Sequence, residues 1–131
     1  MIQVRNLKKT FIKDGNRIEV LRGLDLKIED GTSLAILGVS GSGKTTFVHI
    51  LGTLDHPTSG EVLFNGLDVF NWPEKKLASF RNRTIGFVFQ FHNLLPEFSS
   101  LENTMMPALI SGMPRRNALE RAETLLHDVG L

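Results

Sequence analysis

Short runs of alternating apolar and polar residues fill the first third of the chain. They extend over Ile2 to Phe11, Arg17 to Leu21 and Leu24 to Ile28, and alternation with a period of two is typical of half-buried β-strands. Asp14-Gly15-Asn16 lies between the first two runs and has the residue types of a tight turn. We therefore predict an antiparallel β patch in this part of the chain.

A different pattern begins after the turn residues Glu29-Asp30-Gly31. Ser33 to Leu37 is largely apolar without alternation, as in a strand buried on both faces of an α/β sheet. Thr84 to Phe89 is a second candidate for such a core strand. Glu61 to Phe64 predicts a further strand, which ends at the turn Asn65-Gly66. Together with the helices described next, these strands predict an α/β fold.

Four helices are predicted from periodicity and end signals. Lys44 to Leu51 and Glu74 to Asn82 have the spacing and composition of helices. Ser99 and Glu102 have the spacing of a capping box, which predicts that a third helix starts directly after Ser99. The fourth helix is predicted over Pro114 to Val129. The residues on its predicted apolar face are Ala118, Ala122, Leu125, Leu126 and Val129.

Composition and charge narrow the class of protein. The 131 residues suit one compact domain, and 41% hydrophobic residues are enough for an ordinary core. With 15 basic and 14 acidic residues the net charge is +1, so no field of one sign favours binding to nucleic acid or anionic lipid. The lack of cysteine excludes disulfides and thiolate metal sites. No signal-peptide core and no run of roughly 20 apolar residues occurs, so we expect a cytosolic chain without direct membrane insertion.

The candidate chemistry lies in one glycine-rich segment. Gly38-Val39-Ser40-Gly41-Ser42-Gly43-Lys44-Thr45 matches the phosphate-binding pattern GxxxxGK[ST] and stands between a predicted strand and a predicted helix, as that motif requires. Its glycines let successive backbone N–H groups point at anionic oxygens. Lys44 is expected to reach the β- and γ-phosphates of a nucleoside triphosphate, and the Thr45 hydroxyl to bind Mg²⁺. The candidate phosphate-binding residues are Gly38, Ser40, Gly41, Ser42, Gly43, Lys44, Thr45 and Thr46.

A glycine- and serine-rich loop that matches this pattern by chance is the alternative interpretation, and the flanking strand and helix argue against it. A phosphate-binding loop does not identify the class of enzyme, so the surrounding residues must do so. The DxxG and NKxD motifs that are usual in GTPases do not occur in the sequence.

Two longer segments resemble the amino-terminal half of an ABC transporter nucleotide-binding domain. They are LRGLDLKIEDGTSLAILGVSGSGKTTFVHILGTLDHPTSGEVLFNG and GFVFQFHNLLPEFSSLENTMMP, and the resemblance covers essentially the whole chain. It implies a P-loop ATPase core of the ABC type with an antiparallel β subdomain, and it makes residues 1–131 the amino-terminal portion of a single nucleotide-binding domain. The segment FHNLLPEFSSLEN is most similar to the lipoprotein-releasing subfamily, with macrolide-export and cell-division ABC subunits as close competitors.

The resemblance also implies roles for individual residues, with ATP and Mg²⁺ as cofactors. Phe11 takes the position of the aromatic residue that stacks on adenine, which is often Tyr in the family, and a core phenylalanine on an edge strand is the alternative. Gln90 matches the Q-loop glutamine, which contacts Mg²⁺ or the attacking water. Its place directly after a predicted strand agrees with the position of sites in open α/β sheets. Lys44 and Gln90 are therefore the candidate catalytic residues, and Thr45 and Gln90 the candidate metal ligands.

The segment after Gln90 points to partner proteins. Phe91 to Phe98 is a predicted loop rich in aromatic and aliphatic residues, the composition of a docking surface, and local packing of these side chains is the alternative. In the family this neighbourhood receives the transmembrane permease subunits. The resemblance further implies that the protein forms a homodimer. It also implies a cytoplasmic protein of a bacterium, bound peripherally to the cytoplasmic face of the inner membrane.

Several motifs of the family are not found after Gln90. These are the LSGGQ-like signature, the apolar Walker B strand that ends in Asp-Glu, and the switch histidine. In the family the Asp organises Mg²⁺ and the Glu polarises the attacking water. We therefore expect a domain truncated before these motifs, without hydrolysis of its own. The missing strand lies between the two core strands in the family, so we expect self-association or strand exchange to repair the sheet.

Two functional interpretations remain open from the sequence. In one, the chain belongs to an ATPase subunit that drives a membrane transporter. In the other, it is a non-catalytic nucleotide-binding or structural fragment. An adenylate or shikimate-type kinase is a weaker third possibility, because the segment around Gln90 has no role in such a kinase.

Overall fold

The computed structural model describes residues 1–91 and 93–131. The chain divides into two compact units, Met1–Leu77 and Ala78–Leu131. No helix within the described residues is long and apolar enough to cross a membrane.

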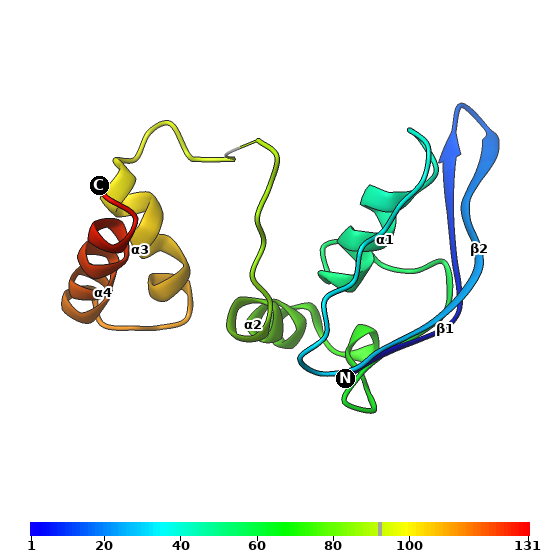
Figure 1. The fold of residues 1–131 in the computed structure, drawn as a ribbon, viewed down its shortest axis with the longest axis horizontal. Coiled ribbons are helices and arrows are strands. Elements are labelled where there is room, and N and C mark those ends of the chain that lie inside the picture. The colour runs from blue at the N-terminus through cyan, green and yellow to red at the C-terminus, as the bar shows by residue number, and fades with distance from the viewer. Residues whose placement is uncertain (92) are drawn as a thin grey trace. The chain divides into compact units, whose positions relative to one another are not determined.

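The first unit is built on the antiparallel sheet that the alternating residues predicted. Its strands are β1 (Ile2–Lys13), β2 (Asn16–Ile28), β3 (Ser59–Phe64) and β4 (Leu67–Asp68), in the order β2-β1-β3-β4 with antiparallel neighbours throughout. The long β1–β2 hairpin is the blue ribbon in Figure 1. The predicted antiparallel patch is therefore confirmed, with Arg17 to Leu21 and Leu24 to Ile28 joined into one continuous strand.

Both hairpins of this sheet close with the turns that the sequence predicted. Asp14 and Gly15 have φ angles of 50° and 78°, and Asn65 and Gly66 have φ angles of 49° and 80°. Two successive residues with positive φ are typical of the type I′ turn, whose twist matches that of the flanking strands. Asp, Asn and Gly tolerate that backbone, so the turns were predictable from the local sequence alone.

The pairing of β1 with β2 skips one residue near the end of the hairpin. Lys9 is opposite Leu21, but Thr10 is opposite Glu19, so Val20 has no partner on β1. An extra residue of this kind is a β-bulge, which bends the strand and redirects the side chain. The bulge changes which side chains of β2 face the same way as those of β1.

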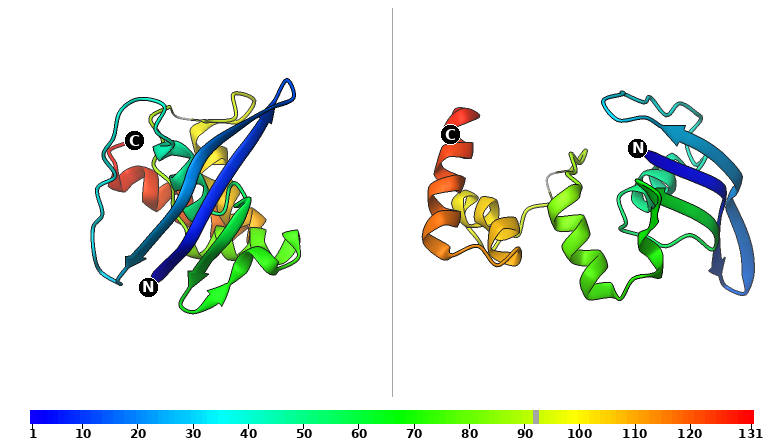
Figure 2. Two further views of the ribbon diagram at one scale, coloured as in Figure 1. Left: turned by 90° about the vertical axis from the view of Figure 1, so that its right-hand side faces the viewer. Right: turned by 90° about the horizontal axis from the view of Figure 1, so that it is seen from below.

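Helix α1 (Lys44–Leu51) lies against one face of this sheet, as the views in Figures 1 and 2 agree. Burying the apolar side chains of the helix and the sheet stabilises the unit by roughly 25 cal/mol for each Å² removed from water. The short 3-10 helix η1 (Val69–Asn71) and the first turn of α2 (Glu74–Thr84) complete the packing. The buried side chains of this unit are Val4, Leu7, Leu21, Phe47, Ile50, Val62, Phe64, Val69 and Leu77.

The second unit contains α3 (Ser100–Ile110) and α4 (Arg115–Asp128), which pack on each other. Their shared core holds Met105, Ala118 and Ala122, with partly buried apolar neighbours around it. The predicted apolar face of the last helix is thus confirmed for its two alanines, while Leu126 is half-buried. The prediction is wrong for Leu125 and Val129, which are 46% and 72% exposed, because the buried residues of α4 in the core shared with α3 are Ala118 and Ala122, in the first half of the helix.

The two predicted core strands are not formed. Residues 33–39 are irregular, and Leu37 is 90% exposed instead of buried on both faces. Thr84 is the last residue of α2, and residues 85–89 are irregular, with Val88 fully exposed. A strand needs a neighbour for its backbone N–H and C=O groups, and neither segment pairs with another strand in the described parts of the chain. The apolar composition was therefore insufficient to make these segments strands.

The capping box at the start of α3 is confirmed atom by atom. The Ser99 backbone N–H and hydroxyl both donate to Glu102 Oε2, at 2.9 and 2.8 Å, and the Glu102 N–H donates to Ser99 Oγ at 3.3 Å. The hydrogen bond from the Ser99 backbone, together with that from its hydroxyl, lowers the pKa of Glu102 below its ordinary 4.5. The box therefore fixes the first residue of α3 and makes its cap sensitive to acid.

We expect Ser99→Ala to destabilise the second unit at neutral pH, because it removes the acceptor for the helix N–H and one donor to the carboxylate. Since the pKa of Glu102 is lowered on folding, its contribution is complete above pH 4.5 and is lost as the pH falls through the folded-state pKa. Thermal unfolding at a series of pH values should show the difference between wild type and variant shrinking below pH 4.5. Ser100→Ala, one residue along, is the matched control and should show no such pH dependence.

Candidate functional site

Helix α1 begins without a side-chain cap. Its N-cap residue is Gly43, with φ of 93°, and neither a side-chain cap nor an acidic residue of the first turn neutralises its N-terminal N–H groups. The first helical hydrogen bond runs from Phe47 N to Gly43 O, at 2.9 Å. The N–H groups of Lys44, Thr45 and Thr46 therefore precede the helical hydrogen-bond ladder, and the positive end of the helix dipole lies at the same place. An oxyanion suits this position.

A cavity of about 310 Å³ opens at this helix end. Six of the predicted phosphate-binding residues line it directly. The other two are Gly38 and Ser42, and the Ser42 side chain lies where a Cβ on Gly38 would point. Val20 of β2 also lines the cavity. The full lining is Val20, Ser40, Gly41, Gly43, Lys44, Thr45 and Thr46.

Val20 is the residue that sequence reasoning missed. It is a bulged residue of β2, skipped by the register with β1 between Leu21 and Glu19. A regular alternation would have given Val20 the same direction as Ile18 and no special role. No local signal marks the bulge, because it arises from how β1 and β2 pair.

Lys44 lies folded back over the loop. Its Nζ donates to the carbonyl oxygens of Gly38 and Val39, at 2.8 and 2.7 Å. These bonds curl the loop around the cavity, so that the ammonium and the backbone N–H groups of α1 border the same space. The ammonium is thus held by neutral carbonyls, which an anionic oxygen can replace as the stronger partner.

Glycine is required where the loop approaches β2. A Cβ on Gly43 would come within 2.8 Å of Val20 Cγ1 and 3.1 Å of the Val20 carbonyl oxygen. A Cβ on Gly38 would lie 2.8 Å from Ser42 Oγ. The loop can therefore pack this closely only where side chains are absent, which gives the glycine spacing of the motif a physical cause.

Phe11 lies on the same strand hairpin. It is 41% exposed and stands opposite Ile18 on β2. The Lys9 ammonium lies over its ring, 4.8 Å from the centroid. Phe11 is not a buried core residue, and β1 is an inner strand of the sheet over its first part.

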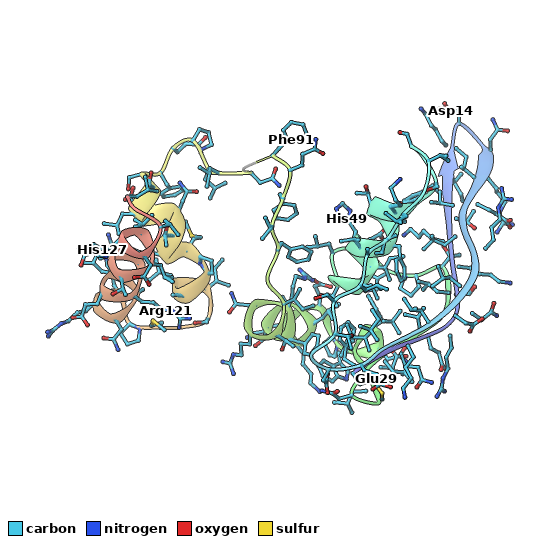
Figure 3. The ribbon with its side chains drawn as sticks, viewed as in Figure 1. Asp14, Glu29, His49, Phe91, Arg121 and His127 are labelled. Carbon is cyan, nitrogen blue, oxygen red and sulfur yellow. The ribbon has the colours of Figure 1, made fainter. Side chains whose placement is uncertain are left out.

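Gln90 belongs to the second unit, whereas the phosphate loop belongs to the first. Gln90 is exposed in an irregular stretch, so its predicted meeting with a nucleotide held by the loop stays a prediction. Figure 3 shows the neighbouring Phe91 on the segment between α2 and α3. His92, the residue after Phe91, lies outside the described residues.

The acidic and histidine residues of the described chain do not gather into a metal centre. No group of three His, Asp or Glu side chains is placed to hold an ion among residues 1–91 and 93–131. His49, labelled in Figure 3, projects from α1, and no hydrogen bond between its side chain and another described residue gives it a function. Any cation bound here would take oxygen ligands from a bound phosphate and water, with the Thr45 hydroxyl at the cavity.

The sequence pattern of the ABC transporter family matches residues 21–131. The chain belongs to the ABC transporter family. Over all of its residues it is 99% identical to the lipoprotein-releasing system ATP-binding protein LolD of Syntrophus aciditrophicus (strain SB), and it covers 59% of that protein. It is 52% identical over the same length to the LolD protein of Geobacter metallireducens, covering 58% of it. The chain thus spans about three fifths of the length of the curated relatives it matches.

A solved structure agrees with this ABC assignment. It is a dimeric post-hydrolysis state of the ATP-binding cassette MJ0796 with ADP and Pi. The match has a TM-score of 0.87 and 35% sequence identity, and covers 97% of this chain and 56% of that one. The predicted fold class, an ABC ATPase cassette with an antiparallel subdomain, is therefore confirmed.

We expect Gly43→Ala to weaken the binding of inorganic tripolyphosphate by roughly tenfold or more. The new methyl group would meet Val20 and require a strained positive φ, a cost of about 1–3 kcal/mol, and the loop would move from its position beside the helix end. Isothermal titration calorimetry measures this loss.

Gly31→Ala is the matched control for that variant. Gly31 also has a positive φ, of 73°, but a Cβ there meets nothing within 4 Å. This substitution should lower stability by about 1–2 kcal/mol and leave tripolyphosphate binding unchanged. Equal binding losses in both variants would show that the contact with Val20 is unimportant.

Proposed function

We propose that this chain forms part of the ATP-binding subunit of an ABC transporter, in which ATP binding and hydrolysis drive transport, and that the process served is lipoprotein release. The observation that carries the proposal is the cavity at the uncapped start of α1, bordered by Lys44 and Thr45. The LolD relatives, named as lipoprotein-releasing system ATP-binding proteins, support the choice of nucleotide and of process.

The base of the nucleotide is proposed to stack on Phe11. Val20 lines the phosphate cavity, and Ile18, two residues earlier on β2, is the cross-strand partner of Phe11. Cross-strand partners lie on one face of a sheet, so β2 leads from the phosphate end of the site to the aromatic ring. A ring that is 41% exposed has surface left for stacking.

The residues at the cavity suit a bound Mg²⁺. Thr45 offers a hydroxyl, the hard oxygen ligand that this ion prefers, and the phosphates and water supply the others. When bound, Mg²⁺ neutralises charge on the phosphate oxygens. We propose Gln90 as the further protein ligand and as the residue that orients the attacking water. The alternative, a fragment that binds nucleotide without cleaving it, applies to residues 1–131 on their own, because they contain no Asp-Glu pair.

We expect Lys44→Ala to weaken ATP binding roughly tenfold or more and to abolish hydrolysis in the complete protein. The variant loses the ammonium that faces the most highly charged oxygens of the ligand. Calorimetric titration with ATP and Mg²⁺ measures the first effect, and phosphate release measures the second. Lys75→Ala removes the same charge from an exposed position on α2 and is the control. Wild-type turnover in the Lys44 variant would refute the assignment of the site.

The loop after Gln90 is proposed as the surface that meets the transmembrane permease subunits. Its apolar side chains are exposed, including Phe91 at 72% and Leu94 at 56%, so local packing does not cover them within their unit. The Asn103 side chain holds the backbone of this loop: its Nδ2 lies 2.9–3.0 Å from three carbonyl oxygens, and its Oδ1 accepts from Leu95 N at 2.9 Å. A loop held in this way can present a defined apolar surface. The subunit would then lie on the cytoplasmic face of the bacterial inner membrane.

Self-association is the second proposed interaction. Residues 33–39 and 85–89 expose apolar side chains and pair with no strand in the described chain, and unpaired extended segments readily add strands from another copy. The solved relative MJ0796 is described as dimeric.

We expect sedimentation velocity of residues 1–131 to show dimers or larger species that increase with concentration. Leu37 and Val88 are the most exposed apolar residues of the two segments, so Leu37→Lys together with Val88→Lys should shift the distribution toward monomer. A stable, well-folded wild-type monomer at every concentration would contradict self-association.

A further inference from the structure

Lys9 is the only charged side chain that is buried among the described residues. The residue is 9% exposed and points to the same side of β1 as the apolar core. A charged side chain is almost never buried unless it is paired, because burial removes its hydration. The burial of Lys9 therefore requires that its ammonium have partners.

The Lys9 ammonium is held at two points by one segment. Its Nζ donates to Asp55 Oδ1 at 2.6 Å and to the His56 carbonyl oxygen at 2.7 Å. The same Asp55 oxygen accepts the His56 N–H at 2.8 Å. The carboxylate thus fixes both the ammonium and the turn that supplies the second acceptor.

This segment directly follows α1. The N–H groups of Leu54 and Asp55 both donate to the His49 carbonyl oxygen at the end of the helix, at 2.8 and 3.3 Å. Farther along, Thr58 N donates to Lys8 O at 2.9 Å. The helix that begins at the phosphate loop is therefore tied, at its other end, to β1 beside Lys9.

The ammonium also lies over the ring of Phe11, at 4.8 Å from its centroid. This distance is within the range of a cation–π contact. One face of the ring is thus occupied by a group that cannot easily move, and the exposed part of the ring is left for another partner. An ion pair used only for stability is often replaceable by apolar side chains of similar volume, whereas a group that orients an aromatic ring is not.

We propose that Lys9 is a positioning residue for the nucleotide base. Clamped by Asp55 and the His56 carbonyl, it holds the Phe11 ring so that the open face receives the base, while α1 holds the phosphates. This inference rests on the proposed function, in which Phe11 stacks on the base. It predicts that Lys9 contributes to the binding of ATP and not to the binding of a triphosphate that has no base.

The test is a double-mutant cycle of Lys9→Met and Phe11→Leu, with ATP and inorganic tripolyphosphate as ligands in calorimetric titrations. We expect Lys9→Met to weaken ATP binding about threefold to tenfold, the scale of an oriented stacking contact. Tripolyphosphate binding should not change. In the Phe11→Leu background the loss of ATP affinity caused by Lys9→Met should disappear, because Lys9 acts through the ring.

Arg5→Met is the matched control. Arg5 is also on β1 and pairs with Glu61 at 3.5 Å, but both side chains of that pair are more than half exposed. Its replacement should leave the affinities for both ligands unchanged. Folding of Lys9→Met is checked by the fluorescence emission of Trp72, the one tryptophan of the sequence. If that variant does not fold, Asp55→Asn tests the same contact between Lys9 and its carboxylate partner. It keeps the ammonium and should produce a smaller loss for ATP alone.

Three outcomes would overturn the proposal for Lys9: equal losses for ATP and tripolyphosphate, the same ATP loss with and without Phe11, or no loss. If Phe11→Leu itself left ATP binding unchanged, the stacking role of Phe11 would fail and this inference with it. A wild-type protein that binds neither ligand would instead refute the proposed function as a whole. The outcomes therefore separate failure of the clamp from failure of the site.

Discussion

The close approach of the phosphate loop to β2 is the constraint on which the site depends. Gly43 packs against Val20 at a distance that excludes any side chain, and this contact positions the first turn of α1. Because the helix starts there without a cap, its N–H groups and its dipole face the cavity. The attraction for an anion thus comes from the backbone, and the side chains of Lys44 and Thr45 add to a field that the fold already provides.

A second device joins the far end of α1 to the sheet. The pair of buried Lys9 and half-buried Asp55 connects the segment after α1 to β1. Desolvation of the ammonium offsets part of the attraction in this pair, and loss of the carboxylate would leave a buried charge without its counter-ion. Its value is geometric, since it relates the helix that begins at the phosphate loop to the strand that carries Phe11.

The two segments that were predicted as core strands show that apolar composition alone does not predict burial in a sheet. Ser33 to Leu37 and Thr84 to Phe89 are apolar enough for a sheet interior, yet the first is irregular, the second is irregular after Thr84, and Leu37 and Val88 are almost fully exposed. Burial of an apolar segment lowers the free energy of the folded protein. Strand formation additionally requires a neighbouring strand at hydrogen-bonding distance. The chain covers about three fifths of its curated relatives, and the described residues supply neither segment with such a neighbour.

The sequence by itself determined the local features, because each depends on residues close together in the chain. The Asp14-Gly15 and Asn65-Gly66 turns, the Ser99 capping box and the glycine spacing of the phosphate loop are of this kind. Only the tertiary structure decided the bulge that brings Val20 to the cavity and the burial of Lys9 against Asp55, 46 positions away. Strand register and a distant ion pair follow from how separate segments meet, and no local pattern of residue types encodes that meeting.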